Sequence, residues 1–133
     1  MSRTVICRRG QVEDLRHLKF AEDLGLPPES IEYNVIGLGH EFWIAIEQDT
    51  VVGFTVLAKT RTNEFTIMHL EVANSQKGQG IGSKLVQGIL ESNPSVELLV
   101  VPLAGTEEFY EQLGFRKSTQ WEMRRTNNGA SRL

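Results

Sequence analysis

Residues 70–85 read LEVANSQKGQGIGSKL, and this stretch decides how the rest of the chain is interpreted. It begins inside an apolar, strand-like run, passes through Gly78, Gly80 and Gly82, and continues into a helical pattern of apolar residues. Glycine weakens both strands and helices, because it loses the most conformational freedom on folding. The glycines therefore indicate that the backbone at this strand-to-helix junction comes close to another group. A helix N-terminus offers unpaired N–H groups and a partial positive charge, so a phosphate or diphosphate fits there.

The spacing of the glycines argues against two common nucleotide-binding loops. A nucleoside triphosphate loop requires G-x-x-x-x-G-K-[ST], whereas Gly82 is followed first by serine and then by lysine. A dinucleotide-binding loop requires glycine where Ser83 stands, and it belongs to an early strand-helix-strand unit. Lys77 would add a positive charge beside a bound anion, and a flexible turn without a ligand is the structural alternative.

Composition and charge are those of an ordinary soluble globular protein. The 133 residues fit one domain, 40% are apolar, 23% are charged, and the formal net charge is -3. A net negative charge argues against nucleic acid as a partner, because phosphate contacts need a concentrated basic surface. No apolar run approaches the roughly 18 residues of a membrane span, and residues 1–10 lack the apolar segment of a signal peptide. Cys7 has no partner for an intrachain disulfide, so we expect a cytoplasmic protein, and no metal site is predicted.

The hydrophobic periodicity predicts the element order β-α-α-β-β-β-α-β-α-β in a single domain, residues 1–133. This order is typical of an α/β (α+β) protein with a largely antiparallel first half and a crossover helix. The predicted elements are a strand at 4–9, helices within 11–25 and 26–39, a hairpin at 41–59 turning at QDT, a strand at 63–72, a helix at 81–92, a strand at 96–101, a helix at 105–114, and one or two strands within 115–126. Residues 127–133 are expected to form a frayed tail.

Two motifs in this order resemble the GNAT family of N-acetyltransferases. That family joins a central strand ending in Leu-x-Val to a loop [Gln/Arg]-x-x-Gly-x-[Gly/Ala], which corresponds to residues 70–72 and 77–82 here. Its second mark is an aromatic-Tyr pair followed after three residues by Gly-Phe, and residues 109–115 read FYEQLGF. The resemblance covers nearly the whole chain. It implies a GNAT fold, with a mixed, mostly antiparallel central sheet splayed between its fourth and fifth strands and about four flanking helices.

The resemblance implies acetyl-CoA as the co-substrate and a primary amine, on a small molecule or a protein, as the acceptor. The diphosphate of coenzyme A would lie on the glycine loop, and the pantetheine arm would run along the edge of the central strand. Lys77 stands where the family has glutamine or arginine. The residues implied to contact the cofactor are Leu70, Val72, Lys77, Gly78, Gln79, Gly80, Ile81, Gly82, Ser83 and Phe109.

The same resemblance implies direct attack of the amine on the thioester in a ternary complex. Tyr110 would protonate the departing thiolate, and the N–H of Val72 would polarise the thioester carbonyl. Many family members carry a glutamate as general base where this chain has Thr66. His69 and Glu71, which share one face of the strand, are the nearest candidates. Each has a structural alternative: a core aromatic ring for Tyr110, a packed imidazole for His69 and an ion pair for Glu71. His40 and Glu41 at the start of the hairpin are further candidates, and an amine that arrives neutral or loses its proton to a water chain would need no base.

Two substitutions favour an alternative function, a catalytically silent domain of the same fold that binds acetyl-CoA or CoA for regulation. Thr66 cannot act as a base, and Leu103 replaces an asparagine that contacts the cofactor in many family members. An acidic rim on the acceptor side would attract a protonated amine. The residues expected in that rim are Glu22, Asp23, Glu29, Glu32 and Glu41. The resemblance also leaves a homodimer open, because family members are often dimers.

Overall fold

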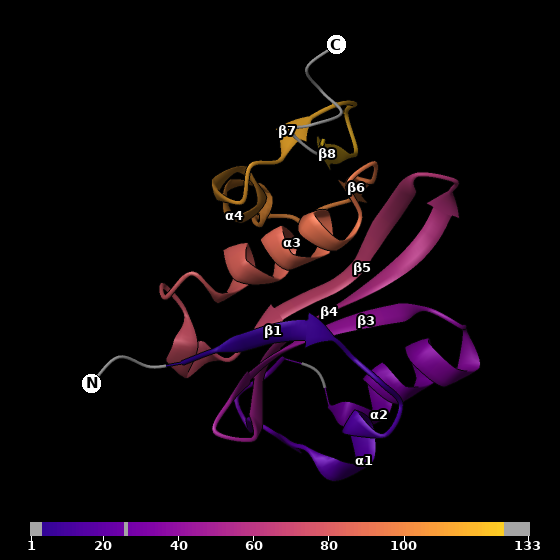
Figure 1. The fold of residues 1–133 in the computed structure, drawn as a ribbon. Helices are drawn as coiled ribbons and strands as arrows, with labels where there is room; N and C mark the ends of the chain where they lie inside the picture. Colours follow the sequence, from indigo (N-terminus) through magenta and orange to yellow (C-terminus); the bar gives the residue numbers. More distant parts are fainter. Residues whose placement is uncertain (1–3, 26, 127–133) are drawn as a thin grey trace.

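The computed structural model describes residues 4–25 and 27–126, so the predicted tail at 127–133 lies outside this range (Figure 1). The strands are β1 (Ile6–Arg9), β2 (Lys19–Phe20), β3 (Glu41–Glu47), β4 (Thr50–Arg61), β5 (Glu64–Val72), β6 (Glu97–Val100), β7 (Arg116–Lys117) and β8 (Met123–Arg125). The helices are α1 (Asp14–His17), α2 (Pro28–Glu32), α3 (Ile81–Ser92) and α4 (Glu107–Gln112), with a π-helical segment η1 (Tyr33–Gly37) and a 3₁₀ turn η2 (Asn74–Gln76). None of the described helices is long and apolar enough to cross a lipid bilayer.

The strands form one sheet in the order β1-β3-β4-β5-β6-β8-β7, with β2 paired to the start of β4. Among the described strand pairs, β2–β4 and β5–β6 are parallel and the others antiparallel, so the predicted mixed and mostly antiparallel sheet is confirmed. The predicted hairpin is β3–β4. Its connecting residues, Gln48 and Asp49, have φ values of 49° and 64°, which suit a two-residue turn that follows the twist of the strands.

The helix predicted within residues 11–25 is wrong for its second half. Only Asp14–His17 is helical, and Lys19 and Phe20 form β2, which pairs with Thr50 and Val51. The N–H of Ala21 continues this pairing by donating to the carbonyl of Val51 at 2.9 Å. Pairing with the edge of β4 outweighs the weak local preference for a helix, because it satisfies main-chain groups and packs the Phe20 ring against the core.

Helices cover both faces of the sheet (Figure 1). On one face, α3 buries an apolar stripe against β3, β4 and β5, and Tyr110 of α4 and Phe115 belong to the same apolar cluster. On the other face, Ile31 of α2 and side chains near α1 pack against Phe54 and Val56 of β4. These two faces define the two sides from which a ligand can approach β5.

The sheet splits between β5 and β6, as predicted for the fourth and fifth strands of the expected order. Parallel pairing begins at Glu64↔Glu97 and ends at Thr66↔Leu99, although β5 continues to Val72. Just beyond the last pair, the register between β4 and β5 shifts and leaves Met68 as an extra residue in β5. A bulge of this kind bends a strand and increases its twist, which turns the second half of β5 away from β6.

A bidentate ion pair joins β1 to α1 and leads to a prediction about stability. Both terminal nitrogens of Arg8 donate to the Asp14 carboxylate at 2.8 Å, and the N–H of Gln11 donates to it at 2.7 Å. Hydrogen bonding to Arg8 holds the pKa of Asp14 below its usual range. Such a carboxylate stabilises the fold above its unfolded pKa, near 3.9, and this contribution is lost as pH falls through the folded pKa.

We therefore expect Asp14→Asn to lower the free energy of unfolding by about 1 kcal/mol at pH 7. Urea denaturation at a series of pH values measures this, and the difference from wild type should shrink as pH falls below about 4. Glu13→Gln, at the exposed neighbouring position, is the control and should match wild type. A deficit that stays constant down to pH 2 would contradict the assignment.

Candidate functional site

The second half of β5 presents an open main-chain edge. The N–H of Ala73 donates to the carbonyl of Val52 in β4 at 2.8 Å. Successive N–H groups point to opposite sides of a strand, so the N–H of Val72 points away from β4. Because the β5–β6 pairs end at Thr66↔Leu99, no β6 residue pairs with Val72. This N–H is therefore available to a ligand that lies in the split.

The glycine loop follows directly and leads into α3. Gly78 and Gly80 have φ values of 82° and 78°, in the left-handed region that favours glycine, and an added Cβ at either would meet nothing within 4 Å. Gly80 is the N-terminal cap of α3, and its carbonyl accepts from the N–H of Lys84 at 3.0 Å. Among residues 4–25 and 27–126, no carbonyl accepts from the N–H groups that surround this cap. These groups belong to Gly78, Gly80, Ile81, Gly82 and Ser83.

The side chains of the predicted cofactor residues point in different directions. Leu70 and Ile81 are buried in the core beneath α3, so only their main-chain groups can reach a ligand. Lys77 and Gln79 are exposed in the loop. Phe109 of α4 is 40% exposed, and its ring lies 3.7 Å from where a Cβ on Gly82 would stand. The absence of a side chain at Gly82 thus lets α4 approach the first turn of α3.

Tyr110 is buried at the same junction between α3 and α4. Its ring makes edge contacts with Phe109 and Phe115, at centroid distances of 5.1 Å and 5.6 Å. Burial, and then the negative charge of Glu71, raise the pKa of Tyr110 to about 12. The phenol therefore stays protonated throughout the neutral range and is a proton donor there.

Glu71 and His69 lie on the face of the sheet opposite α3. Their cross-strand partners, Phe54 and Val56, belong to the apolar cluster on the α1–α2 side. A side chain at Gly25 would collide with the Glu71 carboxylate, so this glycine leaves room for it. The negative charge of Glu71 contributes to the raised pKa of Tyr110, so these two groups interact electrostatically.

The remaining residues discussed from the sequence are Thr66, Leu103 and the expected acidic rim. Thr66 lies in the last β5–β6 pair, with its hydroxyl 3.1 Å from that of Thr60, and Leu103 is 78% exposed. Two residues of the expected acidic rim have structural partners. Glu41 pairs with Arg9 at 3.4 Å, and Asp23 accepts from the N–H of Ser75 at 2.7 Å. Glu22, Glu29 and Glu32 are exposed.

Sequence reasoning missed an ion cluster at the paired end of the split. Arg124 of β8 donates to Glu64 of β5 at 2.9 Å, to Glu97 of β6, and to Glu122 at 3.2 Å. Glu64 and Glu97 face each other in the register of the parallel pair, and Arg124 neutralises the repulsion between them. Nothing in the sequence signals this cluster, because its members come from three separated segments.

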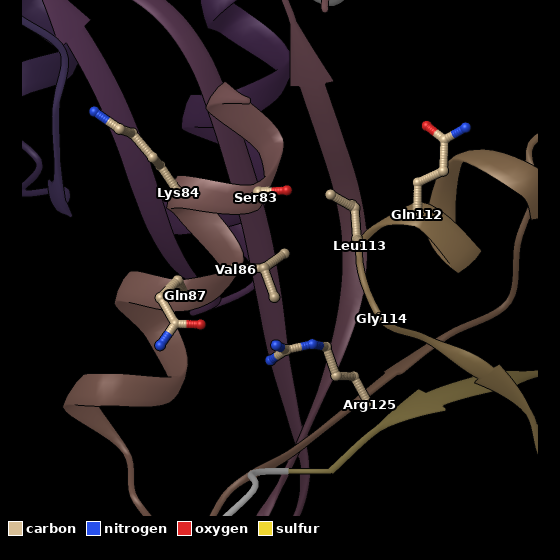
Figure 2. A pocket seen from close by; sticks show the side chains of 8 residues that line it. All are labelled: Ser83, Lys84, Val86, Gln87, Gln112, Leu113, Gly114 and Arg125. Atoms are coloured by element: carbon tan, nitrogen blue, oxygen red, sulfur yellow. The ribbon is translucent and has the colours of Figure 1, made fainter. Parts of the chain in front are cut away.

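Sequence reasoning also missed Arg125, which lines a pocket between α3 and α4 (Figure 2). The sequence shows it only as the second of two adjacent arginines, residues 124 and 125. In the structure, Arg124 forms ion pairs with three glutamates, whereas the side chain of Arg125 is directed between α3 and α4 (Figure 2).

Comparison with known proteins gives one family and one fold. Residues 38–117, more than half of the chain, match a family model described as an acetyltransferase (GNAT) domain. No curated protein matches the chain.

Solved structures of GNAT acetyltransferases are similar over nearly the whole chain. One from Brucella melitensis in complex with acetyl-CoA has 14% identity and a TM-score of 0.68, covering 94% of this chain and 89% of that chain. A ribosomal-protein alanine N-acetyltransferase from Escherichia coli has 15% identity and a TM-score of 0.71, covering 93% and 94%. One from Staphylococcus aureus has 20% identity and a TM-score of 0.62, covering 92% and 99%. At these identities the likeness shows a shared fold.

Proposed function

Because the chain belongs to the GNAT acetyltransferase family, we propose that it transfers the acetyl group of acetyl-CoA to a primary amine by direct attack in a ternary complex. One observation carries this proposal. The open edge of β5 leads directly to the free N–H groups at the start of α3, and the protonated phenol of Tyr110 lies close by. A single elongated ligand with amides at one end and a diphosphate at the other matches these groups.

The residues at the start of α3 suit the diphosphate of coenzyme A. Free N–H groups at a helix N-terminus bind anions, and the left-handed conformations of Gly78 and Gly80 bring them together without a side chain in the way. Lys77 adds a positive charge in the same loop. On the open edge of β5, main-chain groups would pair with the amides of the pantetheine arm, as an added strand does.

The residues around the split would then serve the reaction. The N–H of Val72 stabilises the negative charge that develops on the thioester oxygen. Tyr110 donates its proton to the sulfur as the thiolate leaves, and its raised pKa keeps that proton in place until then. The acceptor approaches from the α1–α2 side, where Glu71 attracts the protonated amine and accepts a proton from it. His69, on the same face, is the second candidate for this base.

Replacement of Glu71 tests its role. We expect Glu71→Gln to lower kcat/KM for the amine at least tenfold, because it removes both the attraction and the base. It should also lower the pKa of Tyr110 somewhat below about 12, because burial still raises that pKa but the added effect of the Glu71 charge is lost. Ultraviolet absorbance titration, with Tyr110→Phe subtracted, measures this shift. Glu22→Gln, at an exposed carboxylate, is the matched control, and equal effects from both variants would exclude a specific role for Glu71.

A combined binding and turnover experiment tests the function as a whole. Isothermal titration should detect acetyl-CoA binding, and release of free thiol should require an amine from a panel of polyamines, aminoglycosides and peptides. The absence of binding at millimolar acetyl-CoA would reject the proposal. Binding without thiol release for any amine would instead favour a catalytically silent CoA-binding domain, which the threonine at position 66 makes the second candidate.

A further inference from the structure

A pocket of about 420 Å³ lies between α3 and the end of α4 (Figure 2). Ser83, Lys84 and Gln87 of α3 line one wall, and Gln112 and Gly114 line the other. The side chain of Arg125 extends from β8 into the space between these walls. The pocket therefore offers the hydroxyl of Ser83, the amide of Gln87 and the guanidinium of Arg125, whereas the side chains of Lys84 and Gln112 point away from it, and no carboxylate lines it (Figure 2).

Arg125 has no acidic partner within the described part of the chain, unlike its neighbour Arg124. It is half-buried, and burial lowers its pKa. Gly114, with a φ of 94°, makes room for it, because a Cβ there would lie 2.6 Å from its Nε. A partly buried guanidinium is costly without a counter-charge, so an external anion would satisfy it.

A second cavity, of about 360 Å³, is also lined by Arg125, together with Arg116, Lys117, Arg124 and Glu97. Arg124 is already paired with Glu97 there. The guanidinium of Arg125 is directed toward α3 (Figure 2). The pocket beside α3 is therefore the one where Arg125 can meet an anion, and Ser83 of the proposed diphosphate site also lines it.

The pocket begins where the proposed diphosphate site ends. Ser83 belongs to both, and Gln87 lies one helical turn further, about 6 Å along the axis. In coenzyme A, a single ribose ring separates the diphosphate from the 3′-phosphate, which is a phosphate monoester. A guanidinium matches such a group through two parallel hydrogen bonds.

We propose that Arg125 binds a phosphate monoester in this pocket, and that this group is the 3′-phosphate of coenzyme A. The inference rests on the proposed function. Arg125 lies beyond residues 38–117, which match the family model, so family membership assigns nothing to it. Arg125 would make this protein select acetyl-CoA over acetyl-3′-dephospho-CoA.

The test compares the binding of these two thioesters by isothermal titration to wild type, Arg125→Met and Lys59→Met. Lys59 is exposed on β4, and its replacement changes the net charge equally. Arg125→Met should weaken acetyl-CoA binding roughly ten- to hundredfold and leave acetyl-3′-dephospho-CoA binding unchanged, as expected for a charge-assisted hydrogen bond. Lys59→Met should change neither. Arg125→Lys keeps the positive charge but cannot donate two parallel hydrogen bonds, so its affinity for acetyl-CoA should lie between those of wild type and Arg125→Met.

The possible outcomes separate this inference from the proposed function. If wild type binds neither thioester, the proposed function fails. If wild type binds both equally well and Arg125→Met has no effect, only the pocket assignment fails. Equal losses of both ligands in a folded Arg125→Met would also overturn it. Binding of inorganic phosphate alongside acetyl-CoA, without competition, and lost in Arg125→Met, would assign the pocket to a separate phosphorylated ligand and overturn the cofactor assignment.

Discussion

Gly80→Glu is expected to abolish acetyl-CoA binding in a protein that still folds. Gly80 is the cap of α3 in a left-handed conformation, and open space surrounds the position of an added Cβ. A glutamate would place its bulk and its negative charge among the N–H groups proposed to hold the diphosphate. Isothermal titration should then show no detectable heat at millimolar acetyl-CoA, and the circular dichroism spectrum should remain that of wild type.

Gly39→Glu is the matched control for backbone strain. Gly39 precedes β3, has a φ of 71°, and also meets nothing within 4 Å of an added Cβ. Both variants should lose about 1–2 kcal/mol of stability from the left-handed conformation, but only Gly80→Glu should lose binding. Gly80→Ala separates strain from charge and should keep measurable affinity. A folded Gly80→Glu with normal affinity would show that the loop does not hold the cofactor.

Tyr110→Phe is expected to lower turnover by roughly 10²- to 10⁴-fold with little change in acetyl-CoA affinity. The substitution removes the proton donor but keeps the ring that packs against Phe109 and Phe115. An interaction made only as the thiolate leaves affects kcat and kcat/KM equally and spares ground-state binding. The rate of thiol release at saturating amine, together with isothermal titration of acetyl-CoA, measures the two quantities separately.

Tyr33→Phe controls for the loss of a phenol elsewhere. Tyr33 is 64% exposed in η1, so its replacement should leave both turnover and affinity unchanged. If Tyr110→Phe turned over at the wild-type rate, Tyr110 would have no part in proton transfer. If it lost affinity and turnover to the same degree, the hydroxyl would serve cofactor binding instead.

The features predicted best from the sequence are those written in contiguous residues. The strand-loop-helix around Gly80 combines an apolar strand, glycines and an apolar helical face within one short segment, so local patterns suffice to predict it. The turn at Gln48 and Asp49 is likewise local, because an aspartate between two β-rich runs indicates a hairpin. The split was expected only through the resemblance, since neither β5 nor β6 alone reveals where their pairing ends.

The features that escaped prediction depend on tertiary neighbours. Lys19 and Phe20 have an unremarkable local pattern, and they become a strand only because the start of β4 offers a free edge. Arg124 and Arg125 are adjacent in sequence, yet one is surrounded by glutamates and the other faces a pocket. Because successive side chains of a strand point to opposite faces, the two arginines lie on different faces. Which face carries the glutamates depends on residues more than twenty positions away in sequence, such as Glu97.

The short β5–β6 ladder also bears on how the molecule holds together. Within the described residues, the part from β6 onward is joined to the rest by the few pairs up to Thr66↔Leu99, by the ion pair between Arg124 and Glu64, and by apolar contacts beneath α3. A ligand bound in the split would act as an added strand that hydrogen-bonds to β5 and packs against the carboxyl-terminal part. Ligand binding and folding cooperativity are therefore linked. Without a ligand, the two halves of the sheet can open locally along the split, and a bound ligand should suppress this opening and stabilise the fold.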